Sequence, residues 1–216
     1  MNKRILFSGI IFCFFSFLTP CHSYYVSPRG YFIGEVGHAT DWILANEIGS
    51  FLRKEGVGSV ADFGCGNGDY VSLLLHSNIN AVGFDGNPIT KDLSDGICYV
   101  QDLSVSFDFG IQSDWVISLE TGQYLPKEYE GVFIDNLIRH ARSGLILSWA
   151  SEEQAGFNYL NPQSNNYIKN LLSKRGWRAD ESAEILLRTS CSIPWYKKNI
   201  MVFRAPQKEN SKNFKE

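Results

Sequence analysis

The sequence predicts an α/β protein built on a doubly wound, mostly parallel sheet with helices on both faces. Short apolar runs alternate with segments of helical periodicity, and a glycine-rich turn follows the first well-defined run. Four successive apolar runs also end in polar or acidic side chains. In an open parallel sheet the carboxyl ends of the strands lie together at one edge, where ligands bind. The sequence therefore indicates a single domain with a ligand site at that edge.

The length and composition fit one globular domain. The chain has 216 residues, of which 44% are hydrophobic and 20% charged, and its formal net charge is −3. A protein that binds nucleic acid needs a basic face, and none is evident in the sequence, so no nucleic-acid partner is expected. The five cysteines include no C-x-x-C pair. Neither a disulfide framework nor a zinc site is therefore indicated.

Residues 1–23 have the layout of a secretory signal peptide. A basic start precedes an uncharged, mostly apolar stretch over 5–18, and small residues at Cys21 and Ser23 permit cleavage before Tyr24. The apolar stretch is shorter than the ~20 residues that span a bilayer. An uncleaved anchor, attaching the protein to a membrane through this segment, is the alternative. The protein is therefore expected to be exported or membrane-anchored.

The folded domain is expected to occupy 24–206, followed by a polar, disordered tail over 207–216. Its first predicted helix lies over 37–54, where apolar residues recur at helical spacing. Gly56 follows this segment and is typical of a helix end.

The run Val60–Tyr70 is predicted to form a buried strand, a tight turn and the opening of a helix that continues to His76. Asp62 lies at the end of the strand, and glycines occupy alternate positions of the turn. Glycine lets the backbone pass close to a ligand, and a helix N-terminus points its amides at whatever is bound. The same pattern also occurs in ordinary connections between a strand and a helix, which is the alternative interpretation.

Three further strands complete the row of polar strand ends. They are predicted over 80–87, 97–100 and 115–119, and they bring Asp85, Asp102 and Glu120 to the same edge of the sheet. Asp85 lies 17 positions after Gly68. This is close to the ~20-residue interval of a carboxylate that binds ribose hydroxyls.

The second half of the chain continues the alternation. Helices are predicted over 129–142 and 165–174, and strands over 144–150, 183–187 and 200–204. Because His76 and His140 fall on predicted helices, they are interpreted as surface residues. His38 precedes the first helix and is the histidine to test as a base.

The glycine spacing favours a cationic nucleotide without phosphate. A dinucleotide fingerprint has the form G-x-G-x-x-G, whereas this chain has G-x-G-x-G with Asp69 in the place of the third glycine. An acid at that point repels phosphate, and no G-x-x-x-x-G-K-[ST] run is present. S-adenosylmethionine carries a ribose, an adenine, an ammonium and a sulfonium, and it is the expected cofactor.

The run Asp62–Gly68 resembles the D-x-G-C-G-x-G motif of class I S-adenosylmethionine-dependent methyltransferases of the small-molecule type. The family also places acids after its second and third strands, as at Asp85 and Asp102. The resemblance implies a Rossmann-like, seven-stranded sheet whose last strand is antiparallel. The cofactor-binding residues that it implies are Asp62, Gly64, Cys65, Gly66, Gly68, Asp85, Asp102 and Ser118.

The segment 114–126 is similar to the D-x-V-x-x-x-E-x-x-E-H-x-P loop of the same family, with Gln123 and Tyr124 in place of Glu-His. Glu120 is the one carboxylate retained, and alone it is a poor ligand set for a hard metal, so no metal is expected. Because Glu120 leaves the strand predicted over 115–119 beside the expected position of the sulfonium, it is the candidate catalytic base. The alternative is that it orients the cofactor or caps the loop. Gln123 and Tyr124 either face the substrate or cap the next helix, and Asn158 in the loop 151–163 is a further candidate substrate contact.

The resemblance implies an S-adenosylmethionine-dependent methyltransferase with a small-molecule acceptor that the sequence does not identify. The first alternative is a member of the fold that binds the cofactor or a partner without turnover, favoured by the missing Glu-His pair and the export signal. A nicotinamide-dependent oxidoreductase on a related sheet is the second alternative, and Asp69 argues against it.

Overall fold

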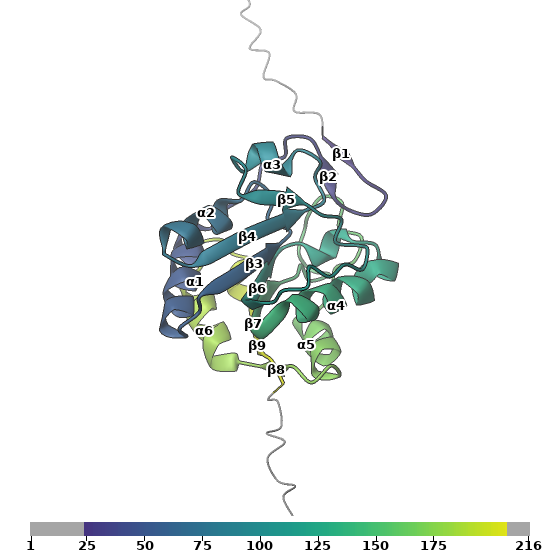
Figure 1. The fold of residues 1–216 in the computed structure, drawn as a ribbon. Coiled ribbons are helices and arrows are strands. Elements are labelled where there is room, and N and C mark those ends of the chain that lie inside the picture. Colours follow the sequence, from purple (N-terminus) through teal and green to yellow (C-terminus); the bar gives the residue numbers. More distant parts are fainter. Residues whose placement is uncertain (1–23, 207–216) are drawn as a thin grey trace, which may run out of the picture.

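A computed structural model describes residues 24–206, which form a seven-stranded sheet with helices on both faces (Figure 1). The expected signal or anchor segment and the expected tail lie outside these residues. The strand order is β5-β4-β3-β6-β7-β9-β8. The strands of this sheet are β3 (Ser59–Phe63), β4 (Asn80–Asp85), β5 (Cys98–Val100), β6 (Ser113–Leu119), β7 (Ala141–Ser148), β8 (Arg178–Ala179) and β9 (Met201–Arg204).

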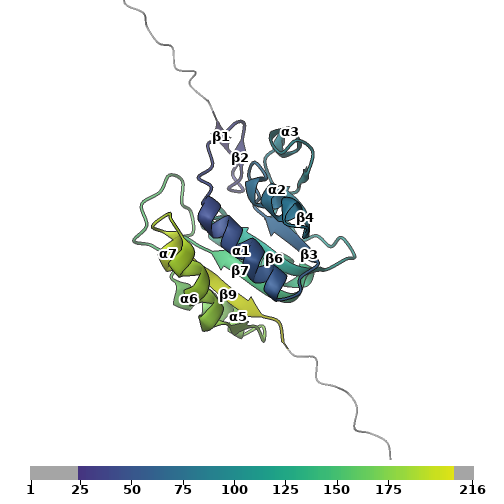
Figure 2. The ribbon, with the colours of Figure 1, turned by 90° about the vertical axis from the view of Figure 1, so that its left-hand side faces the viewer.

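The helices divide between the two faces of the sheet, as Figure 1 shows, and Figure 2 looks onto the face that α1 covers. α1, α2 and α6 contribute side chains to one hydrophobic cluster, and α4 and α5 contribute to the other. The helices are α1 (Trp42–Lys54), α2 (Asp69–His76), α3 (Thr90–Leu93), α4 (Glu130–His140), α5 (Asn165–Ser173), α6 (Glu181–Ser190) and α7 (Tyr196–Asn199). Two short 3₁₀ turns, η1 (Gly122–Tyr124) and η2 (Lys127–Tyr129), follow β6.

Side chains along β3 alternate between the two faces of the sheet, and helices pack on both faces. Val60 belongs to the cluster beneath α1 and α2, whereas its neighbour Ala61 belongs to the cluster beneath α4 and α5. Successive strand residues point to opposite faces, so a strand that is buried on both faces is apolar throughout. The predicted doubly wound sheet is confirmed.

The last strand is antiparallel, as the resemblance implied. β3, β4, β5, β6 and β7 pair in parallel, whereas β9 pairs antiparallel with both β7 and β8. Parallel pairing of the five strands brings their carboxyl ends to one edge of the sheet. Antiparallel pairing places Met201 opposite Leu147 and Arg204 opposite Gly144, so β9 ends at the other edge.

Asp41 joins the start of α1 to the segment that precedes α7. Its Oδ1 accepts a hydrogen bond of 3.0 Å from the N–H of Leu44, which caps the helix. Its Oδ2 accepts bonds of 2.7 Å from the N–H groups of Ser192 and Ile193. Burial alone would raise the pKa of Asp41, but these hydrogen bonds outweigh it and the pKa is lowered.

The strand predicted over 183–187 is wrong, because this segment lies within α6. Asp180 caps the helix by accepting a 3.0 Å hydrogen bond from the N–H of Ala183. Ala183 and Leu187 are buried four residues apart, while Ile185 between them is exposed, which is a helical pattern. The strand at this place in the sheet is β8, two residues that end just before the cap.

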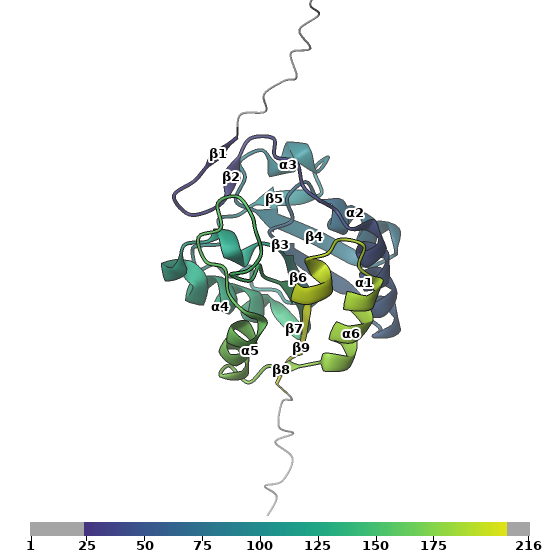
Figure 3. The same cartoon turned by 180° about the vertical axis from the view of Figure 1, so that it is seen from behind.

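An N-terminal hairpin was not predicted. It pairs β1 (Tyr25–Val26) with β2 (Phe32–Ile33) in a separate two-stranded sheet. Figure 3 shows the hairpin next to the loop between β7 and α5. The Tyr24 ring meets the Phe157 ring of that loop edge-on, with 5.9 Å between the centroids. Strands of two residues carry no period that a sequence pattern could reveal.

The interpretation of His140 as a surface residue is also wrong. The imidazole is buried beside the rings of Phe107 and Phe109, with centroids 5.1 Å away in both cases. Nε2 accepts a hydrogen bond from the N–H of Phe109, and Nδ1 donates to the carbonyl of Asn136. His76 is exposed, as expected.

Within residues 24–206, none of the helices combines the length and the apolar character needed to cross a membrane.

Candidate functional site

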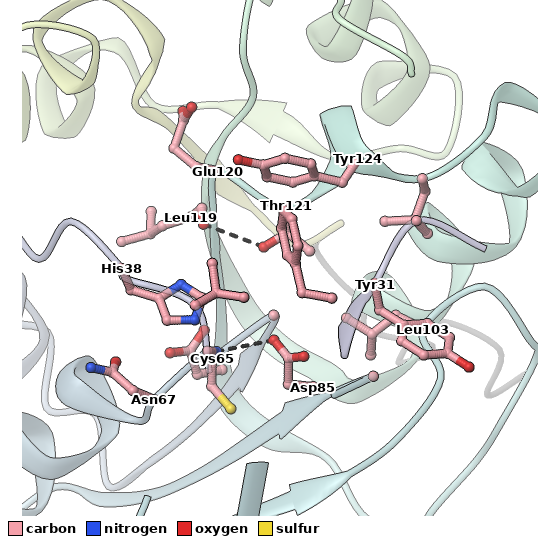
Figure 4. Close-up of a pocket in the computed structure, with 18 of the residues that line it drawn as sticks. Tyr31, His38, Cys65, Asn67, Asp85, Leu103, Leu119, Glu120, Thr121 and Tyr124 are labelled. Carbon is pink, nitrogen blue, oxygen red and sulfur yellow. Dashed lines mark hydrogen bonds between the residues drawn. The ribbon is translucent and has the colours of Figure 1, made fainter. Parts of the chain in front are cut away.

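A cavity of about 320 Å³ opens at the edge of the sheet where the parallel strands end (Figure 4). Its walls come from the ends of β3, β4 and β6, from the hairpin, and from the segments that precede α1 and α7. Eight of the predicted site residues line it, namely Asp62, Gly64, Cys65, Gly66, Asp85, Asp102, Glu120 and Tyr124.

The glycine turn passes directly along the cavity. Gly64 and Gly66 have φ angles of +90° and +55°, a region that glycine adopts without strain. The N–H of Gly64 donates to the carbonyl of Phe84, and the N–H of Gly66 donates to Oδ2 of Asp85 at 3.0 Å. The turn is thereby fastened to the end of β4.

Gly68 and Asp69 lie outside the set of residues that line the cavity. A Cβ at Gly68 would contact the side chains of Ser94 and Cys98, so this glycine allows close packing against the neighbouring segment. The Asp69 carboxylate accepts hydrogen bonds from Thr40 and from Asn67. The placement of Asp69 therefore gives no direct support to the argument that its charge repels a phosphate.

Asp62 and Asp85 bring two carboxyl groups to the site, the first buried and the second half-buried. Asp62 is 4% exposed, and no described residue donates a hydrogen bond to its carboxylate. Burial raises the pKa of Asp62 well above its ordinary value, and Cys98 and Asp85 add to the shift. Burial also raises the pKa of Asp85, although hydrogen bonds from the N–H groups of Asn87 and Gly66 partly oppose the change.

Asp102 is already paired within the protein. Its Oδ2 accepts a hydrogen bond of 3.1 Å from Nη1 of Arg29, and Oδ1 accepts bonds from the N–H and hydroxyl of Ser104. Arg29, which lies in the hairpin, is the one lysine or arginine among the described residues that line the cavity. No second lysine or arginine of the described residues lines the cavity, although the charge of His38 acts to lower the pKa of Asp85.

Glu120 follows β6 in a left-handed conformation, with φ at +52°. Its N–H donates to the carbonyl and to the hydroxyl of Ser148, at 3.2 Å and 2.8 Å. Oε2 accepts hydrogen bonds from Gln123 at 3.1 Å and from Gln154 at 2.8 Å. Burial raises the pKa of Glu120, which these hydrogen bonds partly oppose. Two side-chain amides thus hold one oxygen of the carboxylate in place.

Besides Gly68, three further predicted site residues lie outside the cavity lining. The Ser118 hydroxyl donates to the carbonyl of Phe63 at 2.5 Å and links two strands. Gln123 is fully buried, and besides holding Glu120 its Oε1 accepts a 3.4 Å bond from the N–H of Ala150. Asn158 has φ at +60°, and it is the next residue, Tyr159, that lines the cavity.

Several lining residues carried no sequence signal, because they come from segments distant along the chain. Tyr31 lies in the hairpin, and Tyr196 opens α7. Gly30, also in the hairpin, is a position where only glycine fits, since a Cβ there would lie 2.1 Å from the carbonyl oxygen of Tyr124. The hairpin must therefore keep glycine at this point to close the wall.

His38 lies at the same end of the cavity as the glycine turn, and Figure 4 shows its ring above Cys65. A Cβ at Gly66 would come within 3.0 Å of the ring atoms. Across residues 24–206, no group of three or more His, Cys, Asp or Glu side chains is arranged to hold a metal ion.

No family model matches the sequence, and no curated protein matches it either. Solved structures do match. The magnesium protoporphyrin IX methyltransferase from Synechocystis PCC 6803 with bound SAH has a TM-score of 0.59 at 18% identity, covering 79% of this chain and 90% of that protein. The sugar N-methyltransferase KedS8 from Streptoalloteichus sp. has a TM-score of 0.60 at 14% identity, covering 81% of this chain and 97% of that protein.

A third similar structure is the SAM-bound amino pentose methyltransferase CalS10 from Micromonospora echinaspora. Its TM-score is 0.59 at 12% identity, with 74% of this chain and 89% of that protein covered. The chain therefore has the fold of small-molecule, class I S-adenosylmethionine-dependent methyltransferases, and the expected structural resemblance is confirmed. At these identities the similarity concerns the fold.

Proposed function

We propose that this protein binds S-adenosylmethionine and transfers its methyl group to a small-molecule acceptor. The observation that carries the proposal is the charge of the cavity. Asp62, Asp85 and Glu120 line it, whereas its one arginine is paired with Asp102. Burying uncompensated carboxylates is costly, so such a site favours a ligand that brings positive charge and no phosphate.

The described residues fit this cofactor. The carboxylate of Asp85 stands at the end of β4, where a ribose-binding acid is found in dinucleotide-binding sheets. The Asp62 carboxylate has no internal hydrogen-bond donor and is available to an ammonium group. Two of the similar structures, the protoporphyrin methyltransferase and CalS10, were solved with SAM or SAH bound.

S-adenosylmethionine supplies an electrophilic methyl group on a sulfonium. The protein then has to hold the acceptor atom in line with that methyl group at near-attack distance. We assign Glu120 the role of accepting a proton from the acceptor, which is supported by the bonds from Gln123 and Gln154 to its carboxylate and by burial, which raises its pKa.

Isothermal calorimetry of the purified protein with S-adenosylmethionine and with its demethylated product tests cofactor binding. Asp85→Asn should weaken both affinities by about 10- to 100-fold, because it removes a charged hydrogen-bond acceptor. Asp92→Asn, at an exposed position of α3, is the matched control and should leave both affinities unchanged. Binding of NAD in place of both compounds would instead support an oxidoreductase. Cofactor binding without release of S-adenosylhomocysteine in an acceptor screen would support a member without turnover.

A further inference from the structure

One oxygen of Glu120 has no partner. Oε1 is buried, and no described residue provides a hydrogen bond to it, whereas Oε2 accepts two. A buried carboxylate oxygen without a donor destabilises the ligand-free protein. The residue lines the cavity, so a molecule bound there can supply the missing donor. The described residues therefore leave one acceptor oxygen of Glu120 unused.

Every side chain that holds Glu120 is neutral. Gln123 and Gln154 donate to Oε2, and Gln154 is itself held by Asn199, whose amide donates to its Oε1. Arg29 is paired with Asp102 in another part of the lining. The negative charge of Glu120 is therefore not balanced by a cationic side chain of the described protein. A hydroxyl would satisfy the oxygen, but only a cation would also balance the charge.

Aromatic rings surround this end of the cavity. The rings of Tyr124 and Tyr159 meet edge-on with centroids 5.3 Å apart, and Figure 4 shows the Tyr124 hydroxyl directed toward Glu120. Burial raises the pKa of Tyr124, and the charges of Tyr159 and Glu120 add to the shift, so the phenol stays neutral. Faces of tyrosine rings attract organic cations. The walls and the carboxylate thus favour the same kind of group.

We propose that the methyl acceptor is a small organic amine, which docks as an ammonium group with one N–H donated to Oε1 of Glu120. This inference rests on the proposed function and names its substrate class. Figure 4 shows Glu120 and Tyr124 at one end of the site, and Asp85, Cys65 and His38 at the other. The cofactor's ribose is assigned to the Asp85 end, which leaves the Glu120 end to the acceptor.

Methyl transfer to the amine requires only the amine, the cofactor and Glu120. The ammonium passes one proton to Oε1 of Glu120 and becomes a neutral amine with a free electron pair. That pair forms the new N–CH₃ bond while the CH₃–S bond breaks, and the bonding electrons stay on sulfur, which becomes a neutral thioether. The product is a methylated ammonium, and Glu120 returns its proton to solvent. No oxidant or metal takes part in the balance.

Matched amines and alcohols test the acceptor class. We would measure S-adenosylhomocysteine release with 2-phenylethylamine against 2-phenylethanol, and with glucosamine against glucose. At least one amine should react about tenfold faster than its alcohol, the difference expected for a charged hydrogen bond. Glu120→Gln should abolish that preference, while Glu153→Gln, an exposed glutamate in the same loop as Gln154, should retain it. Equal or faster reaction of the alcohols, or no reaction with either amine, would overturn the proposal.

Calorimetry separates this inference from the proposed function. If Glu120 balanced the sulfonium instead of the acceptor, Glu120→Gln would weaken binding of S-adenosylmethionine but not of its uncharged thioether product. We expect the ratio of the two affinities to stay within about threefold of the wild-type ratio, a change below 1 kcal/mol. A selective loss of S-adenosylmethionine affinity contradicts the amine assignment while supporting cofactor binding. Failure of the wild type to bind either compound overturns the proposed function itself.

Discussion

The buried Asp62 carboxylate lowers the stability of the ligand-free protein, and the same group is proposed to bind the cofactor. Its carboxylate is buried at the end of β3 without a hydrogen-bond donor from the described chain, and burial raises its pKa. The folded protein therefore binds a proton at this position more tightly than the unfolded chain does. The stability that this proton provides is present below the ordinary carboxyl pKa near 3.9 and is lost as the pH rises through the higher folded-state value.

Asp62→Asn should raise the free energy of unfolding of the ligand-free protein at pH 7 by about 1 kcal/mol, because it removes a buried charge. Urea unfolding between pH 4 and pH 7 measures this effect, and the gain should grow with pH. The same variant should bind S-adenosylmethionine more weakly. Asp92→Asn is the control, and a variant destabilised at pH 7 would contradict the prediction.

Gly64→Ala should be more harmful than a glycine substitution with the same backbone angle elsewhere. A Cβ at Gly64 would lie 2.1 to 2.8 Å from atoms of the Thr121 side chain, whereas one at Gly96 would contact nothing within 4 Å. The φ angles are +90° and +86°, so both substitutions carry a similar backbone penalty of about 1–3 kcal/mol. Urea unfolding should show an additional loss of about 1–3 kcal/mol for Gly64→Ala alone. Equal losses would contradict the steric argument.

The acids at the strand ends could be located from the sequence because parallel strands share an edge. This rule predicts that Asp62, Asp85, Asp102 and Glu120 lie together, and all four line the cavity. It could not show that Gln123 points inward to hold Glu120, since the Gln123 side chain is also bonded to the N–H of Ala150, which follows β7 and is distant along the chain. The residues of the hairpin and of α7 have no local pattern at all.

At the scale of elements, α6 shows how a short apolar run misleads. Ile185, Leu186 and Leu187 are consecutive and apolar, which fits a strand, but only Leu187 is buried. Asp180 caps the helix, and its Oδ2 also accepts a 2.8 Å bond from Nε of Arg204 on β9. Asp180 thus fixes where α6 begins and ties it to the sheet.

Asp180→Ala should lower the free energy of unfolding by about 1–2 kcal/mol through loss of the cap. Burial would raise the pKa of Asp180, but its bonds to Ala183 and Arg204 outweigh burial and the pKa is lowered. Its contribution is therefore present above the unfolded pKa near 3.9 and is lost as the pH falls through the lower folded value. Urea unfolding at pH 7 and pH 3 should show the difference shrinking at the lower pH. Glu181→Ala, exposed in the same first turn, is the control.

At the scale of the whole molecule, the cavity joins parts of the chain that are far apart. The hairpin, the strand ends and the segment before α7 all line it. A ligand that contacts all of them binds the folded state and not the unfolded chain, so it stabilises the whole domain by mass action. The domain should therefore report cofactor binding through its melting temperature.

S-adenosylmethionine at 100 times its dissociation constant should stabilise the protein by about 2.7 kcal/mol. For a domain of this size, the melting temperature should rise by about 5–10 °C. Differential scanning fluorimetry measures the shift, and Asp85→Asn should show a smaller one at the same ligand concentration. An equal shift in the variant would mean that the ligand binds away from the end of β4.

The antiparallel course of β9 has a practical consequence. Because Arg204 pairs with Gly144 at the start of β7, the chain leaves the sheet on the side away from the cavity, and Figure 1 shows the two ends of the domain on opposite sides. A fluorophore, affinity handle or immobilisation tether fused after residue 206 starts far from the opening. The same fusion ahead of Tyr25 adjoins the hairpin, so assays that need an unobstructed entrance are best built from the carboxyl end.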